Sequence, residues 1–163
     1  MKVIFLDVDG VLNTVFTART TYGYTFVDTR KVLRLRDIVE RTGAQLVLSS
    51  TWRITDMPIH KLTYAALQDE FRRVRCPVWV DSTPELRGAK RWQEINAWLM
   101  LHPEVDEFII LDDWGDELKP FADRLVLTSK FDGLTKERAE LAISMLGEVN
   151  NGTKISRNSS KDE

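Results

Sequence analysis

The sequence predicts an α/β protein built on one central parallel sheet, and two patterns carry this prediction. Short apolar runs, which are typical of strands buried on both faces, alternate with longer segments whose apolar residues recur at helical spacing. Such alternation is typical of right-handed crossover connections between parallel strands. The length of 163 residues suits one domain with a full core and is too short for two ordinary domains.

The composition agrees with a folded globular protein. Hydrophobic residues make up 43% and charged residues 29% of the chain, which argues against disorder. The net charge of -2 gives no general attraction to nucleic acid, although basic residues cluster at 30–36, 72–75 and 87–91. The single cysteine, Cys76, cannot form an internal disulfide. Because no signal-peptide pattern or membrane-spanning apolar stretch is present, we expect a cytoplasmic protein without a membrane partner.

The first half of the chain predicts two strands, a flap and a helix. The first strand covers residues 3–6, where four apolar residues precede an acidic turn. The segment 13–28 is rich in threonine and aromatic residues and predicts a short two-stranded flap. Helical spacing over 29–41, with Gly43 after it, predicts a crossover helix. A second buried strand is expected at 44–48, directly before a run of hydroxyl residues.

The second half repeats the alternation of strands and helices. Read in the same way, its patterns predict a helix capped by Asp56 that starts near Pro58 and ends before Pro77, a strand at 77–80, a helix at 88–101, strands at 107–111 and 124–128, and a helix at 135–146. Residues 150–163 are polar and predict a flexible tail. A single domain is therefore expected over 1–149.

Acidic pairs stand at the ends of two predicted strands. Asp7 and Asp9 follow the first strand, and Asp112 and Asp113 follow the strand at 107–111. Because ligands bind where the carboxyl ends of parallel strands meet, we expect both pairs at one site. Carboxylates this close repel one another unless a cation or a shared proton stabilises them. One pair alone would be compatible with an acidic turn, but two such pairs indicate a metal site or acid/base chemistry.

The run Asp7-Val8-Asp9-Gly10-Val11 after an apolar strand resembles the first motif of the haloacid dehalogenase (HAD) superfamily. Later motifs follow in the family's order, so the resemblance covers about residues 3–146. It implies a Rossmann-like three-layer sandwich with a five-stranded parallel sheet in the order 5-4-1-2-3, and the short gaps between the motifs leave no room for a large cap domain. Leu-Ser-Ser-Thr-Trp-Arg from residue 48 and Leu-Asp-Asp from residue 111 look most like the small HAD domains of Swiss Army Knife RNA repair proteins.

The resemblance assigns roles to the acids. It makes Asp7 the nucleophile that forms an aspartyl-phosphate, and Asp9 the general acid/base. It implies Mg²⁺ bound by the Asp7 carboxylate, the Asp9 main-chain carbonyl and the Asp112-Asp113 pair. Successive residues at a strand end point in opposite directions, so we favour Asp113 as the direct ligand and Asp112 acting through water. Asp116 is a weaker candidate ligand.

The second motif is a hydroxyl just past a strand, which donates hydrogen bonds to the transferring phosphoryl group. Ser49 is the first choice and Ser50 the second, because one residue of register decides which hydroxyl faces the cleft. Thr51 and Arg53 are further candidates for binding substrate. A hydroxyl run after a strand is also an ordinary helix cap.

The third motif is a lysine that offsets phosphate charge, and Lys90 matches it. Its small neighbours favour close approach to a cleft, but Arg87 and Arg91 compete with it for this role. A surface lysine is the simpler interpretation of Lys90 taken alone.

These features predict a Mg²⁺-dependent phosphatase. Because the chain has no room for a large cap, we expect an open cleft and a nucleotide or nucleic-acid terminal phosphate as substrate. The residues expected to border this cleft are Phe16, Tyr22, Tyr24, Trp52, Arg53 and Trp114, which are types that stack on bases or pair with phosphates. Alternatives with the same fold are a small-metabolite phosphatase, a phosphoprotein phosphatase and a non-catalytic phospho-acceptor or binding domain. Asp9 argues against a phospho-acceptor domain, which would lack an acid/base two residues after the phosphorylated aspartate.

Overall fold

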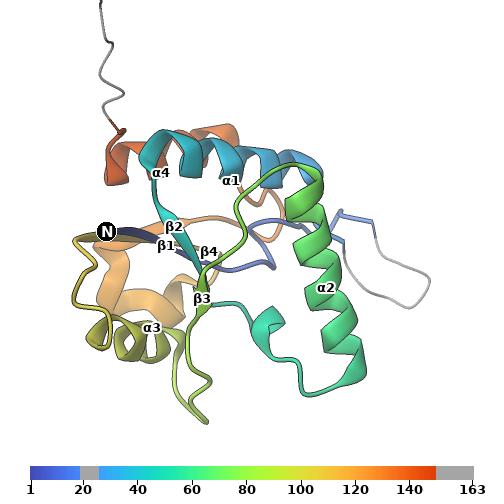
Figure 1. The fold of residues 1–163 in the computed structure, drawn as a ribbon, viewed down its shortest axis with the longest axis horizontal. Helices are drawn as coiled ribbons and strands as arrows, with labels where there is room; N and C mark the ends of the chain where they lie inside the picture. Colours follow the sequence, from blue (N-terminus) through green and yellow to red (C-terminus); the bar gives the residue numbers. More distant parts are fainter. Residues whose placement is uncertain (19–25, 150–163) are drawn as a thin grey trace, which may run out of the picture.

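The computed structural model describes residues 1–18 and 26–149, and its helices lie on both sides of a central sheet (Figure 1). The predicted tail at 150–163 lies outside the described residues, and so does the middle of the predicted flap. The elements are β1 (Lys2–Leu6), α1 (Thr29–Thr42), β2 (Gln45–Leu48), the 3₁₀ helix η1 (Thr51–Arg53), α2 (Pro58–Arg73), β3 (Asp81–Ser82), α3 (Arg91–Met100), β4 (Glu107–Asp112), the 3₁₀ segment η2 (Gly115–Arg124), β5 (Leu125–Leu127) and α4 (Lys136–Leu146). None of the helices within the described ranges is long and apolar enough to cross a membrane.

The sheet has five strands in the order β3-β2-β1-β4-β5, and every pair is parallel. This is the predicted order 5-4-1-2-3 counted from the other edge, so the HAD-like α/β fold is confirmed. Leu6 pairs with Leu48 on one side and with Leu111 on the other. Strands β1, β2 and β4 therefore end at about the same level, and the residues that follow them meet at one edge.

Alternate residues of the strands pack against different helices, which divides the core in two. One cluster joins Ile4, Leu6, Leu46 and other strand residues to buried side chains of α1, α2 and α4. The other joins Val3 and Phe5 to α3 and η2. Because both faces of β1 are covered, all of its residues from position 3 to position 6 are fully buried. The helix layers thus explain the unbroken apolar run at the start of the chain.

The prediction of a strand at 77–80 is wrong. Strand β3 is the short polar pair Asp81–Ser82, and of the apolar residues before it Trp79 is buried in the core, whereas Val80 is exposed. Trp79 is buried and packs edge-to-face against Tyr64 and Phe71, with ring centroids 5.2 and 5.5 Å apart. An apolar run here indicates packing beneath the sheet edge, which looks the same in sequence as a buried strand.

One helix start and one helix cap differ from the prediction, while α2 starts at Pro58 as predicted. Helix α3 begins at Arg91, because Lys90 has extended backbone angles and serves as the N-cap residue. The Lys90 amide donates to the Gln93 side chain at 2.8 Å. Helix α2 has Met57 at its N-cap without a side-chain hydrogen bond, so Asp56 is not the cap. The shift at α3 matters for the site, because it decides which basic side chain points inward.

Candidate active site

Three carboxylates meet at the carboxyl edge of the sheet. Asp7 directly follows β1, Asp112 ends β4 and Asp113 follows it. Each of them offers a carboxylate oxygen, and these oxygens lie within 4.8 Å of one another. Asp7 and Asp112 are buried, and Asp113 is half-buried. The Asp7 amide donates to the Leu111 carbonyl at 2.9 Å, so the strand ladder itself fixes the backbone of Asp7 beside β4.

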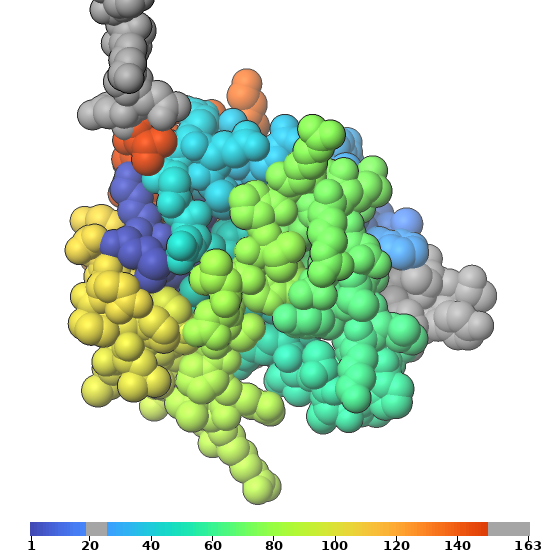
Figure 2. Space-filling model, in the orientation of Figure 1, coloured from blue at the N-terminus to red at the C-terminus, as the bar shows by residue number. Residues whose placement is uncertain are grey.

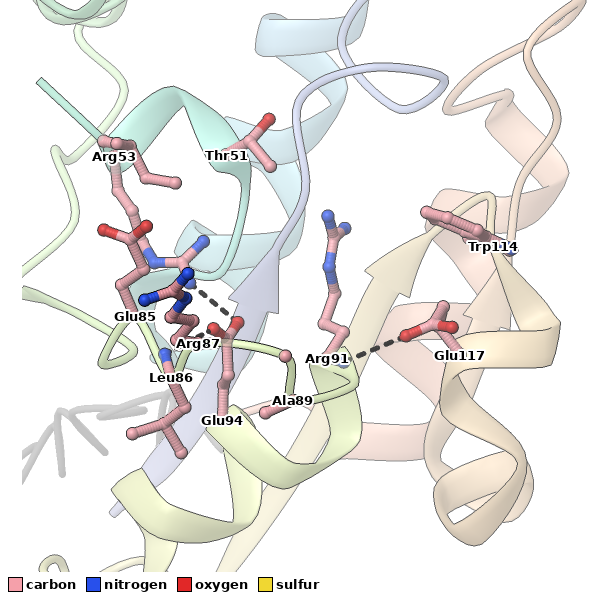
Figure 3. A pocket seen from close by; sticks show the side chains of 12 residues that line it. Thr51, Arg53, Glu85, Leu86, Arg87, Ala89, Arg91, Glu94, Trp114 and Glu117 are labelled. Carbon is pink, nitrogen blue, oxygen red and sulfur yellow. Dashed lines mark hydrogen bonds and ion pairs between the residues drawn. The ribbon is translucent and has the colours of Figure 1, made fainter. Parts of the chain in front are cut away.

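Arg91 places its guanidinium between two of these acids. Its Nη1 lies 2.8 Å from Asp7 Oδ2 and 2.6 Å from Asp112 Oδ2, and its side chain is only 12% exposed. Figure 3 shows this side chain extending from the start of α3 into the pocket between Thr51 and Trp114. Burial lowers the pKa of Arg91, but the two carboxylates raise it by more, so that the guanidinium stays charged.

The acids themselves are held in an environment that opposes their negative charge. Burial is the largest effect on the pKa of Asp7 and raises it, and the nearby charge of Asp112 raises it further. Arg91 and the Ser50 hydroxyl lower this pKa, but the net direction is upward. Burial likewise raises the pKa of Asp112 and of Asp113. Three acids with raised pKa values beside one buried guanidinium form a site that favours an additional positive charge.

Asp9 lies apart from this carboxylate cluster and is exposed. Its Oδ1 accepts a hydrogen bond from Asn13 Nδ2 at 2.8 Å, and its Oδ2 accepts one from Trp52 Nε1 at 2.9 Å. Asn13 belongs to the loop after β1, and Trp52 belongs to η1 after β2. Both oxygens of Asp9 are thus held by separate segments at the same edge of the sheet.

The two candidate serines have different surroundings, although both are fully buried. The Ser50 hydroxyl acts on Asp7 by lowering the pKa of that carboxyl, and Ser50 Oγ accepts a hydrogen bond from the Trp52 main-chain amide at 3.3 Å. Ser49 Oγ has no hydrogen-bond partner among the described residues. The second choice of the sequence prediction, Ser50, is therefore the hydroxyl that lies beside the candidate nucleophile.

Arg53 is engaged with the protein rather than presented to a ligand. Its side chain is 6% exposed, and its Nη2 lies 2.7 Å from Glu94 Oε2. The guanidinium also donates to the main-chain carbonyls of Ser49, Ser50, Thr83 and Pro84. These contacts tie the loop after β2 to the loop after β3 and to α3. They favour a structural role for Arg53 over the predicted role in substrate binding.

A pocket of about 340 Å³ lies beside the acids, between the segments that follow β2, β3 and β4. In Figure 2 the yellow-green segment after β3 projects from the body beside the teal segment after β2, with a hollow between them. The residues that line the pocket include Thr51, Leu86, Arg87, Arg91, Trp114 and Glu117. Trp114 is 58% exposed, so much of its surface is available to a ligand.

The other predicted site residues are scattered. Lys90 is exposed, and among the described residues the basic side chain paired with the cluster is that of Arg91. Asp116 is exposed and pairs with Lys119 at 2.9 Å, away from the three carboxylates. Phe16 is exposed beside Phe131, with ring centroids 6.5 Å apart. Tyr22 and Tyr24 lie outside the described residues.

The family described as the HAD domain in Swiss Army Knife RNA repair proteins matches residues 3–139. The chain belongs to this family. Among curated proteins, none matches it. The matched segment of this HAD domain contains the whole carboxylate cluster together with Arg91. Family membership supports a hydrolase of the phosphatase class that uses a divalent metal. The metal fits this HAD domain, because three converging carboxylates supply the oxygen ligands that hard divalent cations prefer.

Three residues of the HAD domain's site were not predicted in the positions they take. Arg91 was a competitor of Lys90, and Asn13 and Trp52 were not connected to Asp9. The side chain of Asn13 closes the acidic turn four residues after Asp9, which is a usable local signal. The Trp52 contact joins residues 43 positions apart. Spacing along the chain gives no indication of such a contact.

Proposed function

We propose that this HAD domain is a Mg²⁺-dependent phosphatase that hydrolyses phosphate monoesters through an aspartyl-phosphate on Asp7. The observation that carries the proposal is the meeting of Asp7 with Asp112, Asp113 and Arg91 at the carboxyl edge of the sheet. Uncatalysed monoester hydrolysis is so slow that enzymes accelerate it by up to roughly 10²¹-fold. A nucleophile beside several groups that offset charge suits this reaction.

Asp7 and Asp9 divide the reaction into two steps. An Asp7 oxygen attacks phosphorus, the bond to the leaving oxygen breaks, and Asp9 donates its proton to that oxygen. Asp9 is then a carboxylate that removes a proton from water, and the resulting hydroxide cleaves the aspartyl-phosphate. Inorganic phosphate leaves, and Asp7 is regenerated. The exposure of Asp9 supports this role, because both the leaving group and water can reach it.

The other residues manage charge and orientation. Arg91 offsets the charge of Asp7 and of the incoming phosphate, which is the role expected of Lys90 in the sequence prediction. The Ser50 hydroxyl, with Ser49 and Thr51 as alternatives, donates to phosphoryl oxygens. The carboxylates of Asp7, Asp112 and Asp113, with the Asp9 main-chain carbonyl, would hold Mg²⁺. When bound, the metal supplies positive charge against the phosphate dianion.

We propose a nucleotide or a nucleic-acid terminal phosphate as the substrate. The pocket beside the acids supports this choice, because the exposed indole of Trp114 can stack on a base and Arg87 can pair with a phosphate. A 3′-phosphate is favoured only through the RNA repair proteins for which the family is named. The pocket volume of about 340 Å³ suits one nucleoside better than a folded partner.

The test is a phosphatase panel with and without Mg²⁺, run on wild type and on Asp7→Asn. The panel contains an oligonucleotide 3′-phosphate, its 5′-phosphate isomer, mononucleotides, a sugar phosphate and a phosphopeptide, at two salt concentrations. We expect turnover that needs Mg²⁺ and Asp7 and that is greatest with a nucleotide. Full activity of Asp7→Asn, or activity in excess chelator, would overturn the mechanism. A tenfold preference for the sugar phosphate or the phosphopeptide would overturn the substrate assignment.

A further inference from the structure

The position of Asp9 is set by two N–H groups that come from different parts of the chain. An exposed aspartate on a loop is ordinarily free to turn. Here Asn13 Nδ2 lies 2.8 Å from Oδ1, and Trp52 Nε1 lies 2.9 Å from Oδ2. With one donor on each oxygen, the plane of the carboxylate is fixed.

Neither donor is free to move. Asn13 is buried, and its own Oδ1 accepts the Gly10 amide at 3.1 Å, which fixes which end of the Asn13 amide faces Asp9. The indole of Trp52 is half-buried and packs against the core cluster beneath α1 and α2. Both N–H groups are therefore in place before any substrate arrives, as preorganised positioning requires.

Trp52 also links Asp9 to the surroundings of the candidate nucleophile, because its indole contacts Asp9 and its main-chain amide contacts Ser50. The main-chain amide of Trp52 donates to Ser50 Oγ at 3.3 Å, and the Ser50 hydroxyl in turn lowers the pKa of the neighbouring Asp7. The indole N–H is a donor only, and so is the Asn13 amide nitrogen. Each Asp9 oxygen accepts one of these donors and keeps a further lone pair for a leaving oxygen or a water. The arrangement holds Asp9 without using up its capacity to react.

We infer that Trp52 is a positioning residue, whose indole N–H holds the Asp9 carboxylate in register with Asp7 and Ser50 for proton transfer. The inference rests on the proposed function, because Asp9 has a proton to transfer only if the domain cleaves phosphate esters. Trp52 touches no reacting atom in this scheme. Its loss should therefore affect leaving groups that need protonation more than leaving groups that do not.

The test compares Trp52→Phe with wild type on a nucleoside monophosphate and on p-nitrophenyl phosphate. Trp52→Phe keeps an aromatic ring and removes the N–H. The value of kcat/KM reports the transfer to Asp7, in which Asp9 acts as an acid. We expect it to fall at least about tenfold on the nucleotide and clearly less on p-nitrophenyl phosphate, whose leaving group needs little protonation. The inhibition constant of inorganic phosphate should change less than about twofold, since positioning of Asp9 is separate from phosphate binding.

The chain offers a matched control in Trp98. Its Nε1 donates to Asp81 Oδ2 at 2.6 Å, so Trp98→Phe removes the same kind of bond from the α3 side of the sheet. Trp98→Phe should keep the wild-type ratio of the two activities. In an Asp9→Ala background, Trp52→Phe should cause no further loss, because the group that it positions is gone. Trp52→His restores a ring N–H and should recover part of the nucleotide activity. If thermal unfolding shows that Trp52→Phe does not fold, Trp52→Met, which also lacks the N–H, takes its place.

Three results would overturn the inference while leaving the proposed function intact. The first is a Trp52→Phe enzyme with the kcat/KM of wild type, and the second is an equal loss of kcat/KM on both substrates. The third is a Trp52→Phe substitution that lowers kcat/KM as much in the Asp9→Ala background as in wild type. A wild-type protein that hydrolyses no phosphate ester would instead remove the proposed function, and the inference with it.

Discussion

Gly10 lies so close to Asp113 that a β-carbon added at residue 10 would be 2.1 Å from Asp113 Oδ2. The φ angle of Gly10 is +70°, a conformation that residues with side chains resist. Its carbonyl also accepts a hydrogen bond from Thr128 Oγ1 at 2.7 Å. Gly10 therefore sets how closely the loop after β1 approaches the acids after β4.

Gly10→Ala should displace Asp113 and lower the affinity for Mg²⁺ by at least about tenfold, as expected when a metal ligand or its support is disturbed. The measurement is activity as a function of Mg²⁺ concentration. Gly88→Ala is the control, because Gly88 has a similar φ of +74° but nothing lies within 4 Å of an added β-carbon. If both variants need the same Mg²⁺ concentration as wild type, Asp113 does not bind the metal.

Arg91→Ala should lower kcat/KM at least about a hundredfold, because it leaves the buried carboxylates of Asp7 and Asp112 without their counter-charge. Lys90→Ala should lose much less, since Lys90 is exposed at the N-cap. Steady-state kinetics on one substrate separates the two. The reverse order of losses would return the charge-offsetting role to Lys90. Arg91→Lys is expected to be intermediate, because a point charge cannot reproduce the guanidinium's planar contacts.

Arg53→Ala should destabilise the fold by about 3–5 kcal/mol, because it leaves Glu94 buried without its partner and frees four carbonyls. Urea unfolding measures this change. Arg72→Ala removes an ion pair with Asp69 whose side chains are 62% and 76% exposed, and it should cost less than about 1 kcal/mol. A stable Arg53→Ala protein with weakened substrate binding would instead support the substrate contact predicted from sequence.

Cys76 should react slowly with a thiol reagent at pH 8 in the folded protein and quickly in urea. Burial raises the pKa of its thiol from 9.0 to about 12, and the thiolate is the reactive form. The raised pKa means that the folded state holds this proton more tightly than the unfolded state. Its contribution to stability is therefore complete below pH 9 and is lost as the pH rises toward 12. Equal reaction rates in the two states would show that the thiol is accessible.

The strands that carry the acids could be predicted because burial on both faces leaves a clear sequence pattern. Strands β1 and β4 each contain four consecutive apolar residues, 3–6 and 108–111, that are followed by an aspartate, and the structure places the two strands side by side. Strand β3 left no such pattern, because Asp81–Ser82 is polar and lies at the sheet edge. The apolar signal just before it belonged to Trp79, whose burial depends on α2.

The site could be predicted where it depends on strand ends and not where it depends on loops. Asp7, Asp112 and Asp113 follow from the register of β1 and β4. The choice between Lys90 and Arg91 depended on a single residue at the start of α3, and helix boundaries are the least certain part of a sequence prediction. The hydrogen bond from Trp52 to Asp9 forms only when two loops meet in space.

The outer strands of the sheet are short, with two residues in β3 and three in β5. A strand at the edge of a sheet can recruit an extended segment of another chain through its unpaired N–H and C=O groups. Here those groups are few, and the Asp81 carboxylate already accepts the Ser82 amide on one oxygen and the Trp98 indole on the other. Concentrated solutions of the folded domain should therefore resist the strand-by-strand growth that leads to fibrils, even though three longer, strongly apolar strands lie at the centre of the sheet.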